Sequence, residues 1–220
     1  MIKISDLFNP VLSDRTIVKY IQNGQLFESL IPYENIQPNS VDLTLSNSCK
    51  YILSNTYENP SSEFETTIKQ WDCACNIIDP HSIIDTAKPM KYTSDTIGDD
   101  GIIIKPKEFV LLASNEILNI PNGIVGFVQG RSSIARIGIQ TEEAGLVDSG
   151  FRGTITFEVY NETPYNIKIY KGMRVAQIYF IKSQRSSRLY GKDHGSKYRD
   201  QIEATGSKIF EDPEVRRHAK

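Results

Sequence analysis

The sequence has few cysteines and no excess of positive charge. Its 220 residues include only Cys49, Cys73 and Cys75, and the formal net charge is −2. Such a sparse, odd number of cysteines argues against a disulfide framework. A general nucleic-acid binder normally has a basic excess, so we expect no nucleic-acid partner. An anionic ligand would have to be bound by a few local basic residues.

Long apolar runs are also missing. No stretch approaches the roughly 18 apolar residues of a membrane span, and the first residues, MIKISDLFNP, contain no apolar signal core. We therefore expect a cytoplasmic protein with no membrane partner. Hydrophobic residues make up 39% of the chain and charged residues 24%, which is enough apolar material for a packed core.

The usual motifs for metals and nucleotides are absent as well. The three histidines, His81, His194 and His218, are scattered, and Cys73 and Cys75 are separated by one residue rather than by the two to four typical of zinc sites. The zinc-deaminase pattern, the P-loop and the dinucleotide fingerprint do not occur. We expect no zinc and no metal ligands from side chains.

Short strand patterns are abundant from Gly101 onward. They are separated by Gly, Pro or Asn, as in GIIIKPKEFVLLAS, GIVGFVQG, GTITFEVYN, YNIKIYKG and MRVAQIYF. This spacing predicts a mainly β fold of the sandwich or barrel type. Near the N-terminus, VDLTL predicts another strand, and LSDRTIVKYIQNGQL predicts a helix that begins at Ser13 or Asp14 and ends at Gly24.

The chain is expected to form one β domain over residues 1–181, followed by a tail over residues 182–220. Residues 51–100 are polar and rich in turns, and we interpret them as an enlarged insertion with short strands near Ile77 and Ile83. The tail is rich in Ser, Arg, Lys and Gly, which indicates an extended segment that becomes ordered on binding.

The stretch GRSSIARIG is a candidate anion site. Gly130 allows a tight turn, and Ser132 and Ser133 fall where a short helix would begin, beside backbone N–H groups that can meet an anion. Arg131 and Arg136 add positive charge and can bind phosphate through two donors. A Ser-capped surface helix with solvated arginines fits the same residues, and the local pattern leaves both interpretations open.

Two carboxylates in AGLVDSGFRGTITFEV are candidates for chemistry. Alternation puts Phe157 and Val159 on one strand face and Thr156 and Glu158 on the other. A carboxylate in a partly dry setting between aromatic residues has a raised affinity for protons, as a general base requires. A solvated surface Glu is the simpler alternative. Asp148 lies in a turn sequence and could merely bond its own backbone.

Taken together, these motifs resemble the dCTP deaminases of the trimeric dUTPase superfamily. The resemblance rests on GRSSIARIGI, AGLVDSGFRGTITFE and GMRVAQIYF, in this order, with support from LSDRTIVKYIQNGQL, NSVDLTL, GIIIKPKEFVLLAS and YGKDHGSKYRDQ. It covers residues 11–45 and 101–201. It implies a distorted, jelly-roll-like β-barrel with a few short helices, assembled as a homotrimer with active sites between subunits.

The resemblance implies a zinc-independent deamination. Glu158 matches the catalytic Glu, which would take a proton from water so that hydroxide attacks C4 of cytosine. Ser132, Arg136 and the backbone at Ala144 match positions that hold this water and stabilise the transition state. Mg²⁺ would be bound with the triphosphate, mainly by phosphate oxygens.

Further positions match contacts to the nucleotide. The segment from Arg131 to Arg136, with Ser132 and Ser133, would contact the phosphates, and Asp148 the 3′-hydroxyl of the sugar. Thr156, Phe157 and Glu158 would line the base pocket. In the tail, Tyr190, Lys197 and Gln201 match ligand contacts, with Lys197 at the phosphates and the tail as an active-site lid.

The expected reaction is conversion of dCTP to dUTP and ammonia, which supplies dUTP and dUMP for dTMP synthesis. Ser149 after Asp148 is the departure that matters, because AGLVDS leans toward the dUTPase spelling. A bifunctional deaminase and diphosphatase that forms dUMP, or a plain dUTPase, is therefore the alternative. A catalytically idle nucleotide-binding regulator is a third possibility. Inhibition by dTTP is common in the family.

Overall fold

A computed structural model describes residues 10–52, 92–142, 145–191 and 196–217. The strands expected near Ile77 and Ile83 lie outside these ranges. Three short helices occur in the described residues: α1 (Asp14–Gln22), α2 (Ser132–Ala135) and α3 (Pro213–Arg217). Two 3-10 turns, η2 (Tyr33–Asn35) and η5 (Ile209–Glu211), accompany them.

Thirteen strands make up most of the regular structure in the described ranges. They are β1 (Leu26–Phe27), β2 (Val41–Ile52), β3 (Tyr92–Thr96), β4 (Ile102–Ile104), β5 (Phe109–Ser114), β6 (Leu118–Asn119), β7 (Ile124–Gly130), β8 (Ile139–Glu142), β9 (Leu146–Val147), β10 (Arg152–Gly153), β11 (Thr156–Asn161), β12 (Ile167–Ile169) and β13 (Arg174–Lys182). The mainly β fold with a few short helices is confirmed.

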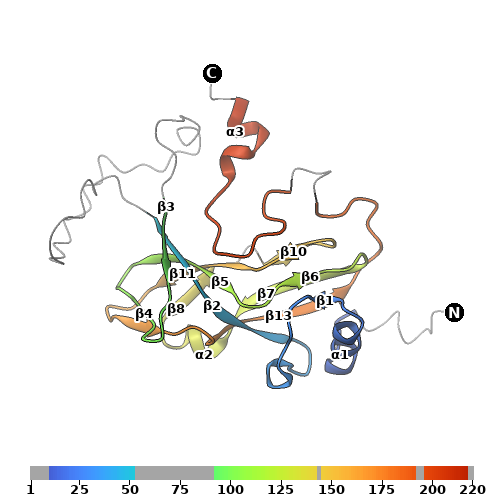
Figure 1. The fold of residues 1–220 in the computed structure, drawn as a ribbon, viewed down its shortest axis with the longest axis horizontal. Helices are drawn as coiled ribbons and strands as arrows, with labels where there is room; N and C mark the ends of the chain where they lie inside the picture. The colour runs from blue at the N-terminus through green and yellow to red at the C-terminus, as the bar shows by residue number, and fades with distance from the viewer. Residues whose placement is uncertain (1–9, 53–91, 143–144, 192–195, 218–220) are drawn as a thin grey trace.

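The strands form a large antiparallel sheet and two small ones (Figure 1). The large sheet has the order β8-β11-β5-β2-β13-β7-β9, with β3 added alongside β2, and the small sheets have the orders β1-β6-β10 and β12-β4. Strand β2 is central because its first residues pair with β13 and its later residues pair with β5 and β3. This arrangement is the distorted barrel expected from the pattern of short strands.

The core follows from the alternation of residues along the strands. In β2, Val41, Leu43 and Leu45 are fully buried, and in β11 Phe157 and Val159 are buried. Helix α1 begins after Ser13, buries Ile17 and is followed by Gly24 at φ +69°, the left-handed conformation that glycine adopts at a helix end. The short helix expected after Gly130 is also present, as α2.

Candidate active site

A cavity of about 460 Å³ opens between the large sheet and the C-terminal tail. Its walls come from β5, β7, β9, β11, the turn after β9 and the tail. Five of the residues expected at the site line it: Asp148, Thr156, Glu158, Tyr190 and Gln201. Apolar and aromatic side chains such as Leu111, Phe151 and Ile155 form much of the rest, as in most small-molecule sites.

Strand β11 presents Glu158 to this cavity. Glu158 is half-buried and lies opposite Leu111 of β5 in an inner strand of the sheet. Thr156 shares its face, while Phe157 points the other way and is fully buried in the core. The expected alternation is therefore observed. Phe157 is not among the lining residues, so its side chain supports the wall from behind instead of facing the cavity.

The turn after β9 holds Asp148 and Ser149 at the edge of the cavity. Asp148 is exposed, whereas Ser149 is buried and its hydroxyl donates to the Ile124 carbonyl at 2.6 Å. The Ser149 hydroxyl therefore anchors the turn to the start of β7. Gly150, at φ +90°, lets the turn pass close to Leu189 and Tyr190 of the tail, where a β-carbon would come within 2.7 Å of Leu189.

Tyr190 and Phe151 form an aromatic wall between the turn and the tail. Their ring centroids are 5.6 Å apart and the rings are tilted at 55°. The Tyr190 hydroxyl accepts a hydrogen bond from the backbone N–H of Tyr198 at 3.2 Å. Burial raises the pKa of Tyr190 above its ordinary value, so the phenol stays protonated at neutral pH and keeps its own hydrogen available to a ligand.

Gln201 connects the tail to β10 and β11. The side-chain Nε2 of Gln201 donates to the Thr154 carbonyl at 2.7 Å, and the backbone carbonyl of Gln201 accepts from the Thr154 N–H at 2.9 Å. Within the described chain, Gln201 Oε1 is the one buried side-chain oxygen or nitrogen without a hydrogen-bond partner. A buried acceptor without a partner is costly, and a ligand N–H or O–H in the cavity would relieve that cost.

A second cavity, of about 500 Å³, adjoins the first and shares Asp148, Tyr190 and Tyr198 with it. It contains two basic residues, Arg188 and Lys197. The Lys197 ammonium bonds both carboxylate oxygens of Asp212 at 2.8 Å. Burial opposes the charge on Lys197, but Asp212 outweighs it and raises the Lys197 pKa, so the side chain remains cationic. Lys197, which we expect at the phosphates, thus lines a cavity next to the one that contains Glu158.

The arginine of the GRSS segment is held by a buried carboxylate. Asp42 of β2 is 1% exposed, and it pairs with Arg131 at 3.2 Å and with Arg174 at 3.2 Å. Arg131 also donates to the Arg174 carbonyl. The sequence did not single out Asp42. Its burial between two arginines arises from the pairing of β2 with β13, which a local pattern does not reveal.

Helix α2 lies away from the central cavity. Among the described residues that line that cavity, none belongs to α2, so Ser132, Ser133 and Arg136 are not brought to Glu158 within the chain. Figure 1 shows α2 below the sheet and the tail above it. All three residues are exposed. Ala144, the expected backbone contact, lies outside the described residues.

Sequence reasoning missed several lining residues. Tyr198 lines both cavities, and Phe151 and Arg188 each line one. Tyr198 directly follows Lys197 in the tail motif YGKDHGSKYRDQ, and this neighbouring position could have predicted that Tyr198 lies at the site. Arg188 had no signal beyond the basic character of the tail.

The residues described in the structure include no group of three His, Cys, Asp or Glu side chains arranged to bind a metal ion. In the same residues, no helix has the length and apolar character needed to cross a membrane.

Comparison with known proteins shows the family. The model of the dCTP deaminase-like family matches residues 11–183. The chain belongs to this family. A dUMP-forming dCTP deaminase of a Sulfurihydrogenibium species is 38% identical over 207 residues, covering 92% of this chain and 98% of the relative. The dUMP-forming dCTP deaminase of Aquifex aeolicus is 31% identical over 209 residues, covering 94% and 98%.

A solved structure agrees with the fold of this dCTP deaminase-like chain. It is the 2′-deoxycytidine 5′-triphosphate deaminase of Agrobacterium tumefaciens, with a TM-score of 0.56 and 18% identity. The match covers 79% of this chain and 48% of the Agrobacterium chain. At this identity the similarity concerns the fold alone.

Proposed function

We propose that this protein converts dCTP to dUMP by deamination followed by release of diphosphate. The observation that carries the proposal is the placement of Glu158 and Asp148 on the walls of one cavity, which adjoins a second cavity lined by Arg188 and Lys197. The relatives named dUMP-forming favour this bifunctional reaction over the dUTP-releasing reaction that was our main expectation.

Deamination would use Glu158 as the general base. Its carboxylate takes a proton from water, and the resulting hydroxide bonds to C4 of cytosine while N3 is protonated. Once Glu158 has given its proton to N3, it takes the proton of the new C4 hydroxyl and passes it to the 4-amino group; the C4–N bond breaks as the C4 carbonyl forms, and ammonia leaves with uracil bound. The half-buried position of Glu158 among aromatic and apolar lining residues suits this proton transfer.

Release of diphosphate would use Asp148. Its exposed carboxylate lies where the two cavities meet, so it can bind the sugar 3′-hydroxyl and orient a second water toward the α-phosphorus. Attack by this water breaks the bond from the α-phosphorus to the bridging oxygen, giving dUMP and diphosphate. The Ser149 hydroxyl donates its hydrogen bond to the Ile124 carbonyl and does not line this cavity. Asp148 is therefore the polar side chain of this turn that can orient the water.

The phosphates would be met by basic residues and by Mg²⁺. Lys197 and Arg188 line the basic cavity, and Arg131, Ser132, Ser133 and Arg136 would reach it from a neighbouring subunit of a homotrimer. The described residues offer basic donors but no three-residue acidic cluster, a set that suits a metal held mainly by phosphate oxygens. Bound in this way, Mg²⁺ would neutralise charge that develops on the leaving diphosphate.

The products decide between the candidate reactions. The purified protein is incubated with Mg²⁺ and either dCTP or dUTP, and the nucleotides are resolved by ion-exchange chromatography. We expect dUMP and diphosphate without accumulation of dUTP. Accumulation of dUTP from dCTP would show a monofunctional deaminase, and turnover of dUTP without turnover of dCTP would show a dUTPase. If neither nucleotide is turned over, the protein is a nucleotide-binding regulator without catalytic activity.

The variant Glu158→Gln tests the base. The amide keeps the size of the side chain but cannot accept the proton, so deamination should fall by roughly 10²- to 10⁴-fold while dCTP binding, measured by calorimetry, is retained. Glu162→Gln, the same change at an exposed residue after β11, serves as the control and should act like the wild type. Near-normal deamination by Glu158→Gln would contradict the mechanism.

A further inference from the structure

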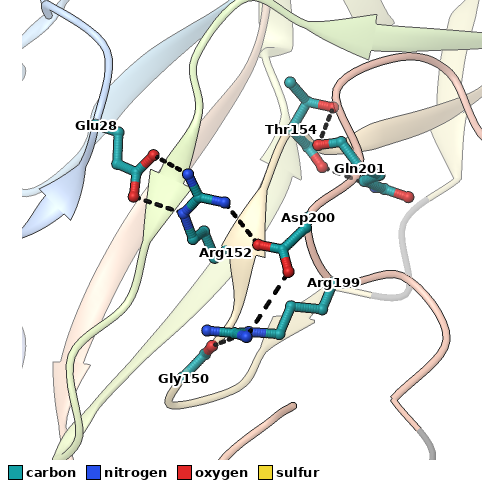
Figure 2. Close-up of polar contacts among 7 residues, drawn as sticks. All are labelled: Glu28, Gly150, Arg152, Thr154, Arg199, Asp200 and Gln201. Atoms are coloured by element: carbon teal, nitrogen blue, oxygen red, sulfur yellow. Dashed lines mark hydrogen bonds and ion pairs between the residues drawn. The ribbon is translucent and has the colours of Figure 1, made fainter. Parts of the chain in front are cut away.

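An ion-pair network joins three distant parts of the chain above the sheet. Arg152 of β10 donates through Nε and Nη2 to the two carboxylate oxygens of Glu28, at 2.6 and 2.7 Å. Its remaining Nη1 donates to Asp200 of the tail at 2.7 Å. Figure 2 shows the guanidinium between the two acids. We call Glu28, Arg152 and Asp200 the Arg152 network.

The network continues directly into the tail segment that lines the cavity. The Asp200 N–H donates to the Arg152 carbonyl at 2.7 Å, and Gln201 forms a parallel bridge with Gly153. Asp200 has φ +62°, a left-handed conformation that Asp and Asn tolerate better than most residues. Asp200 and Gln201 are consecutive, so the chain places Asp200 at Arg152 and Gln201 at Thr154 (Figure 2). Gln201 also lines the cavity.

The same contacts fix the orientation of the Gln201 amide. The Thr154 carbonyl can only accept, so the amide nitrogen of Gln201 must face it, at 2.7 Å. The amide oxygen is then left as the buried acceptor without a partner. Loss of the backbone contacts beside Asp200 would remove this constraint, because the hydrogen bond from the Gln201 side-chain amide to the Thr154 carbonyl depends on the tail lying against β10.

We propose that Arg152 is a positioning residue that docks the tail on the sheet and thereby sets the nucleotide-facing wall at Gln201. This inference rests on the proposed function for its substrate, dCTP, but the docking itself does not. Arg152 is not among the residues lining the two cavities that we assign to the nucleotide, so it acts through Asp200 and the tail. Glu28 holds the guanidinium in the orientation that reaches Asp200.

Tail docking can be measured without nucleotide. Trypsin cleaves after accessible basic residues, and Lys208 lies further along the tail, where its N–H donates to the Tyr198 hydroxyl at 3.0 Å. If opening is fast relative to cleavage, the cleavage rate reports the population of undocked tail. For Arg152→Met and Asp200→Asn, neither of which changes the residues beside this bond, we expect cleavage after Lys208 to be about fivefold faster than in the wild type, the size expected when a surface network of this kind is lost.

Kinetics with dCTP supply the second measurement. We expect both variants to raise KM for dCTP by about fivefold with kcat within about twofold, because bound substrate redocks the tail. The KM of Arg152→Lys should lie between those of these variants and of the wild type. A lysine ammonium keeps the positive charge, but it lacks the planar set of donors with which the guanidinium binds Glu28 and Asp200 at once. Asp200→Asn also tolerates the left-handed backbone, so it carries the test if Arg152→Met does not fold.

The control is an exposed ion pair elsewhere. Asp99 pairs with Lys171, and Asp99→Asn removes the same charge as Asp200→Asn without touching the tail. It should leave cleavage and KM unchanged. Wild-type cleavage rates in Arg152→Met and Asp200→Asn would overturn the proposal, as would a fall in kcat at constant KM. Absence of dCTP turnover in the wild type would overturn the proposed function, while the cleavage rates would still decide the docking.

Discussion

Glu116 is a buried carboxyl group that lies outside the lining of the central cavity. It is 4% exposed and accepts hydrogen bonds from the Thr44 N–H at 2.9 Å and the Thr44 hydroxyl at 2.6 Å. These two bonds join the loop after β5 to Thr44 near the start of β2. Burial raises the pKa of Glu116 above its ordinary value of 4.5 and outweighs the hydrogen bonds, which act in the opposite direction.

The raised pKa predicts how stability depends on pH. As pH rises above 4.5 the unfolded state loses the proton first, so between the two pKa values the folded state binds more protons. The stabilisation from Glu116 is therefore complete below the unfolded pKa and is lost as pH rises through the folded pKa. In Glu116→Gln the amide can accept from the Thr44 N–H and donate to the Thr44 hydroxyl. Because the amide does not titrate, the variant should not lose this stabilisation as pH rises.

Urea unfolding at pH values on both sides of 4.5 measures this effect. The free energy of unfolding of the wild type minus that of Glu116→Gln should be largest in acid and smaller at neutral pH. Glu34→Gln, at an exposed position, reports the effect of removing a surface charge. A difference that grows with pH would contradict the assignment.

At the scale of elements, strand β10 is where the body meets the tail. Gly153 has φ +138°, and a β-carbon there would lie 2.8 Å from the Gln201 carbonyl oxygen. Gly153→Ala should therefore separate the tail from β10, destabilise the fold by about 1–3 kcal/mol and raise KM for dCTP. Urea unfolding and steady-state kinetics measure the two effects.

Gly172 provides the matched control for this change. It also has positive φ, at +78°, but no atom lies within 4 Å of the point that a β-carbon would occupy there. Gly172→Ala should cost stability through backbone strain and leave KM unchanged. Equal KM values for both variants would show that close approach of the tail at Gly153 is unimportant.

The same scale explains which features the sequence could predict. Alternation in β2 and β11 is local, so the strands, the core face and the placement of Glu158 followed from neighbouring residues. The contacts of Arg152 with Glu28 and Asp200, and of Asp42 with Arg131, join residues far apart in the chain. No period or motif encodes such pairs. Lys197 was expected at the phosphates, but its bond to Asp212 was not.

At the scale of the whole molecule, the expected site residues fall into two groups. Glu158, Asp148, Tyr190 and Gln201 meet at one cavity, and the residues of α2 lie elsewhere. A homotrimer with sites between subunits would reunite them, since a cyclic assembly brings two different surfaces of neighbouring chains together. Complementation between two inactive variants tests this arrangement.

Arg136→Ala and Glu158→Gln are each expected to be nearly inactive. If each site takes Glu158 from one subunit and Arg136 from the next, every trimer that contains both variants has one site in three with both intact residues, so mixed trimers should recover about one third of wild-type activity. Separately tagged chains, purified through both tags after co-expression, allow the measurement. Activity no higher than that of the single variants would contradict a shared site.

The central position of β2 also has a consequence for synthesis of the protein. Residues Val41 to Thr44 pair with β13, whose last residue is Lys182, whereas β5 pairs only with later residues of the strand. During translation the start of β2 therefore waits for its partner strand β13 until about 140 further residues have been made. Pairing over such a separation slows folding. The nascent chain therefore exposes Val41 and Leu43 for most of its elongation, and it is a candidate client for ribosome-associated chaperones.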